Sequence, residues 1–173
     1  IMKAVRGAGL KLDWMNVPRL TKLSDEEVKQ NLDPAHDERV FYVYEALKRG
    51  MTVDEIHEIT MIDEWFLCKL QNLIDMDCWL ADGELTQEKY LQAKKWGYLD
   101  STIEAMSSQK VPEHRAASYK MVDTCAGEFA AQTPYFYSTY DEQNEAKEYI
   151  EEQNTGKKRV IVFGSGPIRI GQG

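Results

Sequence analysis

Cysteine, histidine and long apolar runs are all scarce in this sequence of 173 residues. The three cysteines, Cys68, Cys78 and Cys125, cannot all pair, and none stands in a CxxC arrangement beside histidines. We expect reduced, buried thiols, because about 15 Å of helix would separate Cys68 from Cys78. The three histidines show no i, i+4 spacing that would place two ligands on one helix face, so no metal site is expected.

Positive charge is also in short supply. Lysine and arginine number 21 against 29 aspartates and glutamates, which gives a net charge of −8 and a pI of about 5.0. This charge repels nucleic acid and anionic lipid surfaces. No stretch approaches the roughly 20 apolar residues that cross a bilayer, and no signal-like apolar segment follows Ile1. We expect a cytoplasmic protein with neither nucleic acid nor membrane as a partner.

What the chain does contain is typical of a folded domain, with 43% hydrophobic and 29% charged residues. Helix signals begin at once, since residues 1–7 look like the end of a helix that glycine stops. Ser24 with Glu27, and Thr52 with Glu55, have the spacing of a capping box, in which two side chains satisfy free amides at a helix start. Two short helices are therefore predicted after Ser24 and Thr52.

Apolar residues at helical spacing predict further helices over 33–50, 63–80, 86–97 and 100–106. The first opens with proline in its first turn, and the second is the longest and is expected to be central. Their expected apolar positions are Val40, Phe41, Val43, Tyr44 and Leu47 in the first, and Trp65, Phe66, Leu67, Leu70, Leu73, Ile74 and Met76 in the second.

The pattern changes after Pro112. Residues 119–124 and 133–140 are β-prone and predict an extended arm, while the acidic segment 141–156 is expected to be a linker. Residues 158–163 have the pattern of a buried parallel strand. Because a lone strand cannot form a domain, we expect 157–173 to begin another domain, with a self-contained hairpin or tail as the alternative.

A glycine-rich loop follows this expected strand. Glycines let a backbone approach a phosphate closely, and Gly164 and Gly166 fit a GxGxxG fingerprint, although Arg169 stands where its last glycine belongs. This loop is the candidate nucleotide site. Its candidate contact residues are Gly164, Gly166, Pro167, Gly171 and Gly173.

Two other readings carry less weight. Residues 50–80 have the order of a helix-turn-helix, but acidic residues would face the phosphates. Cys125 beside Asp123 and Glu128 resembles a nucleophile with acidic neighbours, yet no histidine is near in sequence, so a buried structural cysteine is favoured. No catalytic residue is predicted.

Segments 121–129 (MVDTCAGEF), 137–140 (YSTY) and 159–173 together resemble the carbamoyl phosphate synthase large subunit, in order and in spacing. Residues 62–67 (IDEWFL) and 3–7 resemble the same family. The resemblance implies a mainly α fold: a helical oligomerization domain with an extended C-terminal arm and one β-strand from a truncated α/β domain. It assigns 1–7 to the end of the first ATP-grasp half, 8–150 to the oligomerization domain, and 151–173 to a linker with the start of the carbamoyl phosphate half.

The resemblance implies a non-catalytic scaffold within an ATP-dependent ligase. The parent enzyme makes carbamoyl phosphate from bicarbonate, glutamine-derived ammonia and two ATP for arginine and pyrimidine synthesis, with ATP and Mg or Mn as cofactors and a glutaminase small subunit as partner. This fragment itself is expected to hold no cofactor and to associate with other large subunits. The alternative is a self-contained nucleotide-binding fragment that uses 164–173. The candidate interface aromatics are Phe41, Tyr44, Trp65, Trp79 and Trp96.

Overall fold

The computed structural model describes residues 1–130, 133, 135–152, 156, 158 and 160–161. The chain divides into two compact units, residues 1–116 and 117–173. The first unit is helical, and the second combines a small sheet with one helix. The mainly α fold class predicted from the sequence is confirmed.

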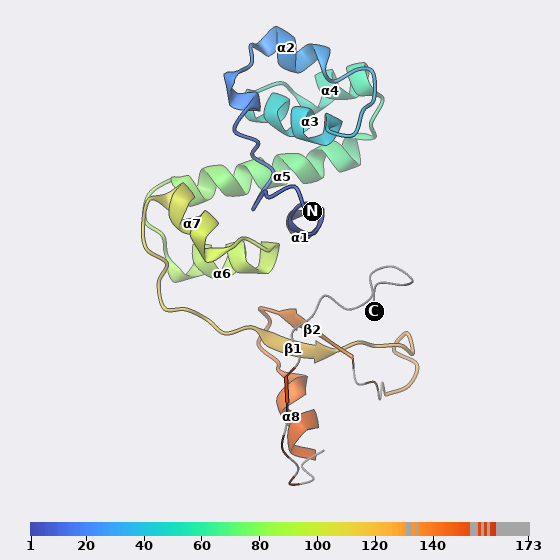
Figure 1. Cartoon of the computed structure of the whole chain (residues 1–173), viewed down its shortest axis with the longest axis vertical. Helices are drawn as coiled ribbons and strands as arrows, with labels where there is room; N and C mark the ends of the chain where they lie inside the picture. The colour runs from blue at the N-terminus through green and yellow to red at the C-terminus, as the bar shows by residue number, and fades with distance from the viewer. Residues whose placement is uncertain (131–132, 134, 153–155, 157, 159, 162–173) are drawn as a thin grey trace. The chain divides into compact units, whose positions relative to one another are not determined.

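The first unit is organised around its longest helix, α5 (Glu64–Ala81). Figure 1 shows α5 between two groups of shorter helices. On one side lie α2 (Asp25–Gln30), α3 (Arg39–Lys48) and α4 (Val53–Thr60), and on the other lie α6 (Gln87–Trp96) and α7 (Asp100–Ser107). The remaining elements are α1 (Met2–Gly7) and a short 3-10 turn, η1 (Leu20–Lys22).

One continuous core holds these helices together. Its fully buried side chains come from most elements of the unit, so no single helix is stable without its neighbours. They include Leu20, Val28, Leu32, Val43, Ile56, Leu67, Leu80, Tyr90 and Ile103. Among the described residues, no helix is both long and apolar enough to span a membrane.

Local capping signals locate several helix ends correctly. Both predicted capping boxes form: Ser24 Oγ accepts a hydrogen bond from the Glu27 amide, and Thr52 Oγ1 accepts one from the Glu55 amide. Gly97 ends α6 with φ of +91°, a left-handed conformation that glycine adopts without strain. These ends depend on residues adjacent in sequence, which is why the sequence predicts them.

Arg49 anchors the loop before α2 to the end of α3. Its guanidinium donates to the carbonyl oxygens of Leu20 and Leu23, each at 2.8 Å, and forms ion pairs with Asp25 and Glu45. Glu45 is buried, so its charge is balanced where water is excluded. One side chain thereby donates to two backbone carbonyls of this loop, of which that of Leu20 also accepts from the Leu23 amide at 3.1 Å.

The predicted start of the helix over 33–50 is wrong by about one and a half turns, since α3 begins at Arg39. A ring nitrogen of His36 lies 2.9 Å from the carbonyl oxygen of Asn31, and the His36 ring packs edge-on against Tyr42 at 5.3 Å. These contacts hold residues 33–38 in a turn. The predicted burial of Val40 is also wrong, because this side chain is 43% exposed.

The second unit pairs β1 (Ser118–Met121) antiparallel with β2 (Phe136–Thr139), with Ser118 opposite Thr139. The predicted extended segments are therefore strands of one small sheet. The predicted linker is wrong in part, because residues 145–152 form the helix α8 (Glu145–Glu152). Packing explains the difference: Tyr149 contacts Phe136 edge-on at 5.3 Å, and Glu145 Oε2 accepts a hydrogen bond from the Met121 amide at 2.7 Å.

Residues 121–129 form a local turn held by hydrogen bonds around Cys125. Asp123 Oδ1 accepts a hydrogen bond from the Cys125 amide at 2.8 Å, and the Glu128 amide donates to the Cys125 carbonyl at 3.0 Å. Gly127 within the turn has φ of +74°. Cys125 is half-buried, and Cys68 and Cys78 are exposed on α5. The prediction of buried thiols is therefore wrong, because both α5 cysteines lie outside its buried stripe.

The Thr52 cap gives a direct test of the helix boundaries. Replacing Thr52 with alanine should lower the free energy of unfolding by about 1 kcal/mol, because the Glu55 amide loses its acceptor. Urea unfolding followed by circular dichroism measures this. Thr52→Ser keeps the hydroxyl and should stay near wild type; equal losses in both variants would contradict the assignment.

The same box predicts a pH effect. The hydrogen bond from the Thr52 amide lowers the pKa of Glu55 below its ordinary value. The stabilisation that Glu55 gives to the folded state is then complete above the ordinary glutamate pKa, and it is lost as pH falls through the lower folded-state pKa.

Candidate functional site

The aromatic residues predicted as interface candidates separate into two groups. Phe41 and Tyr44 are buried in the core, whereas Trp65 is 60% exposed, Trp79 38% and Trp96 37%. Phe66, which the sequence places on the apolar side of the central helix, is also 60% exposed. Large exposed aromatics mark surfaces that other molecules cover. The three tryptophans and Phe66 therefore define the candidate site.

The first half of this site is a groove of about 760 Å³ between α1, α3 and α5, with Trp96 at its border. We call it the Trp65 groove. Its charged lining residues are Arg39 and Lys69, both basic, and the rest of the lining is almost entirely apolar. The lining consists of Ile1, Met2, Arg39, Val40, Val43, Ile62, Trp65, Phe66, Leu67, Lys69, Leu70, Asn72, Leu73 and Trp96.

Side-chain contacts hold the Trp65 ring in place. Its ring and that of Phe66 meet edge-to-face with centroids 5.0 Å apart. Lys69 Nζ lies 4.9 Å from the Trp65 centroid, within cation–π range. The Asp63 carboxylate caps α5 by accepting from the Trp65 amide at 2.9 Å. The start of α5 is thus fixed immediately before the two exposed rings.

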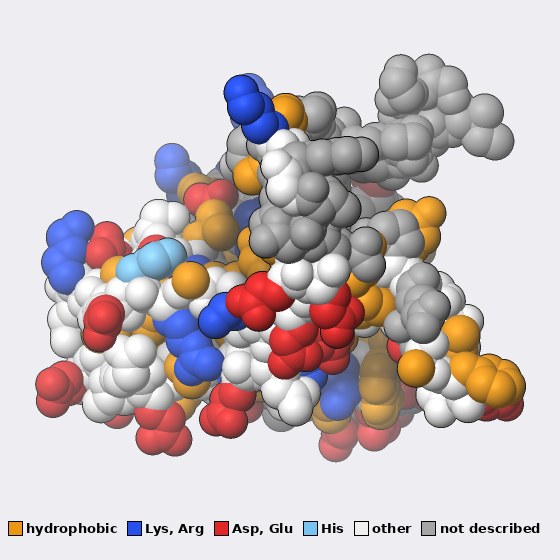
Figure 2. Space-filling view, turned by 90° about the horizontal axis from the view of Figure 1, so that it is seen from below, with side chains coloured by type: hydrophobic (Ala, Val, Ile, Leu, Met, Phe, Trp, Pro, Cys, Tyr) orange, Lys and Arg blue, Asp and Glu red, His pale blue; other side chains and the backbone are white. Residues whose placement is uncertain are grey.

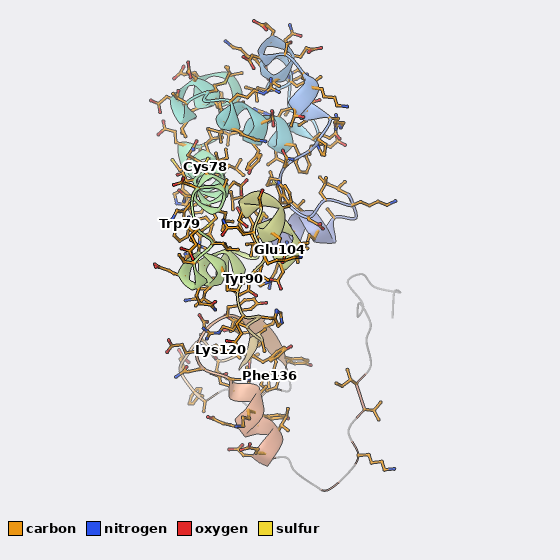
Figure 3. The ribbon with its side chains drawn as sticks, turned by 90° about the vertical axis from the view of Figure 1, so that its left-hand side faces the viewer. Cys78, Trp79, Tyr90, Glu104, Lys120 and Phe136 are labelled. Atoms are coloured by element: carbon orange, nitrogen blue, oxygen red, sulfur yellow. The ribbon has the colours of Figure 1, made fainter. Side chains whose placement is uncertain are left out.

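The second half is a shallower surface of about 380 Å³, the Trp79 patch, lined by Asn72, Asp75, Met76, Trp79 and Trp96. Asn72, Met76 and Trp79 stand at i, i+4 and i+7, so they form one stripe along α5. Lys89 Nζ lies 5.5 Å from the Trp79 ring centroid. Figure 3 shows Trp79 on the outer side of α5.

A buried polar cluster on the opposite side of α5 fixes the orientation of this helix. Tyr98 donates to Asp77 Oδ1 at 2.6 Å, and Tyr44 donates to Asp77 Oδ2. Burial raises the pKa of Asp77, although both hydrogen bonds oppose the shift. Burial and the neighbouring Asp77 charge raise the pKa of both tyrosines, which therefore remain neutral donors. The cluster joins α3 and the end of α6 to α5, and so sets which face of α5 is exposed.

The model of the family described as "Carbamoyl-phosphate synthetase large chain, oligomerisation domain" matches residues 1–122. That range contains the whole of the Trp65 groove and the Trp79 patch. The chain belongs to this family. The large-chain oligomerisation family thus covers the entire helical unit and the first strand of the sheet.

Curated relatives named carbamoyl phosphate synthase large chain match the full length of this chain. The protein of Methanothrix thermoacetophila is 42% identical over 181 residues, and that of Lachnoclostridium phytofermentans is 41% identical over 182 residues. The chain spans 16% and 17% of these relatives, respectively. The predicted resemblance to this family is therefore confirmed, while the domain boundaries after residues 7 and 150 stay predictions.

The predicted phosphate loop lies outside the described residues. No structural statement follows for Gly164, Gly166, Pro167, Gly171 or Gly173, and the nucleotide-binding alternative stays a prediction. Of the predicted strand over 158–163, Lys158, Val160 and Ile161 are described, and the last two are 84% and 77% exposed.

The other sequence hypotheses gain no support from the described residues. Within them, no three histidine, cysteine, aspartate or glutamate side chains gather as metal ligands would. Helix α4 does precede α5 as a helix-turn-helix requires, but Asp54, Glu55 and Glu58 are exposed on it and would repel phosphate. On the face that Figure 2 displays, basic side chains are interspersed with acidic and hydrophobic ones.

Sequence reasoning missed Arg39, Lys69 and Asp77. Arg39 and Lys69 look like ordinary solvated charges, and only the packing of α3 beside α5 places both at one groove. Asp77 carries a usable signal, because it stands seven residues after Leu70 and three before Leu80, on the core-facing side of an apolar helix, where a half-buried carboxylate needs hydrogen-bond donors.

Proposed function

We propose that this chain is a non-catalytic assembly domain of a carbamoyl phosphate synthase large chain, and that two copies associate through the Trp79 patch. The observation that carries the proposal is the exposed pair of Trp79 on α5 and Trp96 at the end of α6, in a chain whose family is described as an oligomerisation domain. Burying such aromatic side chains is a main source of interface energy.

The shape of the Trp79 patch favours a symmetric pairing. A twofold interface places the same surface against itself, which an open, shallow patch permits. The stripe of Asn72, Met76 and Trp79 would pack against its own copy in the manner of two crossing helices. Asp75 and Lys89 border the patch, so each copy offers both a negative and a positive group to its partner.

The matched family motivates the proposed role of the surrounding enzyme. In this proposal the complete protein makes carbamoyl phosphate from bicarbonate, glutamine-derived ammonia and two ATP, with Mg or Mn as the metal and a glutaminase small subunit as partner. The proposed location is the cytoplasm. The helical unit contributes assembly and no reacting group, and its partners are other large chains.

Replacing Trp79 with glutamate should weaken self-association by about 100-fold, because a central aromatic is lost and a charge is buried in its place. Size-exclusion chromatography with light scattering over a concentration series measures the change in dimer fraction. Trp79 is partly exposed and contributes little to the core, so the circular dichroism spectrum should not change.

Phe129→Glu is the matched control. Phe129 is 75% exposed and lies in the other compact unit, so this variant should associate like wild type. If Trp79→Glu and Phe129→Glu dimerise equally well, the Trp79 patch is not the interface.

A further inference from the structure

The exposed face of α5 carries a polar pair near the middle of the helix. Four exposed residues, spaced by four, three and four positions, form one stripe along this face: Cys68, Asn72, Asp75 and Trp79. Because α5 spans Glu64–Ala81, Asn72 and Asp75 lie close to its midpoint. The stripe therefore has a thiol and an aromatic ring toward its ends, with one amide and one carboxylate between them.

The two polar groups have hydrogen-bonding capacity to spare. Gln71 Nε2 donates to Asp75 Oδ1 at 2.9 Å, and Asp75 Oδ2 accepts no hydrogen bond from the described residues. In the same part of the chain the Asn72 amide makes no hydrogen bond, although Asn72 lines the Trp79 patch together with Asp75. An amide nitrogen donates and a carboxylate accepts, so the two side chains are chemically complementary.

A twofold pairing of α5 with its own copy determines which residues oppose each other. When two copies of a helix run antiparallel across a twofold axis, the two residue numbers of every opposed pair have the same sum. An axis midway between Asn72 and Asp75 lies near the centre of α5, where two crossing helices are closest. It sets Asn72 against the partner's Asp75 and, by symmetry, forms this contact twice. It also sets Cys68 against the partner's Trp79, a favourable sulfur–aromatic pairing.

Charge favours this register over its alternatives. A parallel pairing, or an antiparallel one centred on Asp75, would set the Asp75 carboxylate against its own copy, and opposed like charges destabilise an interface. A pairing centred on Asn72 would set Asp75 against position 69. Lys69 lines the Trp65 groove instead, with its Nζ 4.9 Å from the Trp65 ring centroid. The contact between Asn72 and Asp75 therefore satisfies both groups without moving a side chain that is already engaged.

We infer that Asn72 and Asp75 select the register of the dimer: α5 runs antiparallel to its copy, and Asn72 of each chain donates to the partner's Asp75. The inference rests on the proposed self-association through the Trp79 patch. It adds the orientation of the two helices and the residues that determine it. In this arrangement Trp79 contributes buried apolar area, and the polar pair contributes specificity, as single polar contacts do in other helix pairs.

Two charge substitutions at position 72 should change the dimer dissociation constant in opposite directions. Asn72→Asp opposes two carboxylates at each contact and should weaken association about tenfold or more. Asn72→Lys sets an ammonium group against the partner's Asp75 and should strengthen association several-fold. Sedimentation equilibrium over a concentration series measures both constants. A parallel pairing, or one centred on Asn72, would set the introduced lysine against its own copy, so weaker association of Asn72→Lys would overturn the inference.

The exchange of the two residues is the matched control. Asn72→Asp combined with Asp75→Asn keeps the amino-acid composition and the net charge, and it only swaps donor and acceptor. Its dissociation constant should return to within about threefold of wild type. Gln143→Lys makes the charge change of Asn72→Lys at an exposed position in the second unit and should have no effect. An exchange variant that associates as weakly as Asn72→Asp would overturn the inference.

The two cysteines of α5 report the orientation of the helices. In the antiparallel register Cys68 lies one position from the residue opposite the partner's Cys78, whereas the two thiols of one helix are about 15 Å apart along its axis. A bismaleimide too short for that span should give a crosslinked dimer with Cys68 joined to Cys78, identified by mass spectrometry. Links only between identical cysteines would overturn the inference. Wild type that never associates would overturn the proposed self-association as well, whereas dimers insensitive to position 72 would overturn the register alone.

Discussion

Replacing Asp77 with leucine should lower the free energy of unfolding by about 2–4 kcal/mol, because two buried tyrosine hydroxyls lose their acceptor. Tyr44 would lose the acceptor for its hydroxyl, and Tyr98 would retain only a 3.3 Å contact to the Leu73 carbonyl. Urea unfolding monitored by circular dichroism measures the loss. The result would identify the polar cluster as the element that fixes α5.

Asp75→Leu is the matched control for this change. Asp75 lies two residues before Asp77 on the exposed side of α5, where its carboxylate accepts only from Gln71 at 2.9 Å among the hydrogen bonds described. Its replacement should alter the free energy of unfolding by about 0.5 kcal/mol or less. Equal effects at positions 75 and 77 would contradict the burial of the cluster.

The cluster should also make the free energy of unfolding depend on pH. Burial raises the folded-state pKa of Asp77 above its unfolded value. The stabilisation that Asp77 contributes to the folded state is therefore complete below the ordinary aspartate pKa, and it is lost as pH rises through the raised folded-state pKa. The stability advantage of wild type over Asp77→Asn should accordingly be largest at acid pH. A difference that grows between pH 4 and pH 7 would contradict a raised pKa.

The second large effect concerns two neighbouring residues that look alike in the sequence. Leu67→Ala should cost about 2–5 kcal/mol, because Leu67 is 0% exposed and its removal leaves a cavity in the core. Phe66→Ala removes a larger side chain that is 60% exposed, and it should cost about 1 kcal/mol or less. Thermal or urea unfolding of the pair measures the contrast. A greater loss for Phe66→Ala would show that Phe66 is packed against the unit's own core.

The contrast between Phe66 and Leu67 shows what sequence can specify. Helical spacing correctly predicts a long apolar helix over 63–80, because local hydrophobic periodicity reports the helix itself. It does not tell which apolar residues meet the core, since α5 carries more apolar surface than its neighbours cover. Helical spacing alone thus groups Trp65 and Phe66 with the core residues of this helix, although both side chains are 60% exposed.

The other errors have similar physical causes. The predicted start of α3 is wrong because the contacts of His36 hold the preceding residues in a turn, which helix propensity does not reveal. Helix α8 was expected to be a linker because its sequence is acidic, yet Tyr149 and Glu145 attach it to the sheet. In contrast, both capping boxes are predicted correctly, because the residues that form each box lie within four positions of one another. Where a helix boundary depends on tertiary contacts instead, the local sequence does not reveal it.

Sedimentation equilibrium of the unmodified chain over a concentration series tests the central claim of self-association most directly. The account predicts that the average mass rises from 19.9 kDa at low concentration toward twice that value, in accord with a reversible twofold dimer. A mass that stays at 19.9 kDa throughout would contradict association through this chain alone.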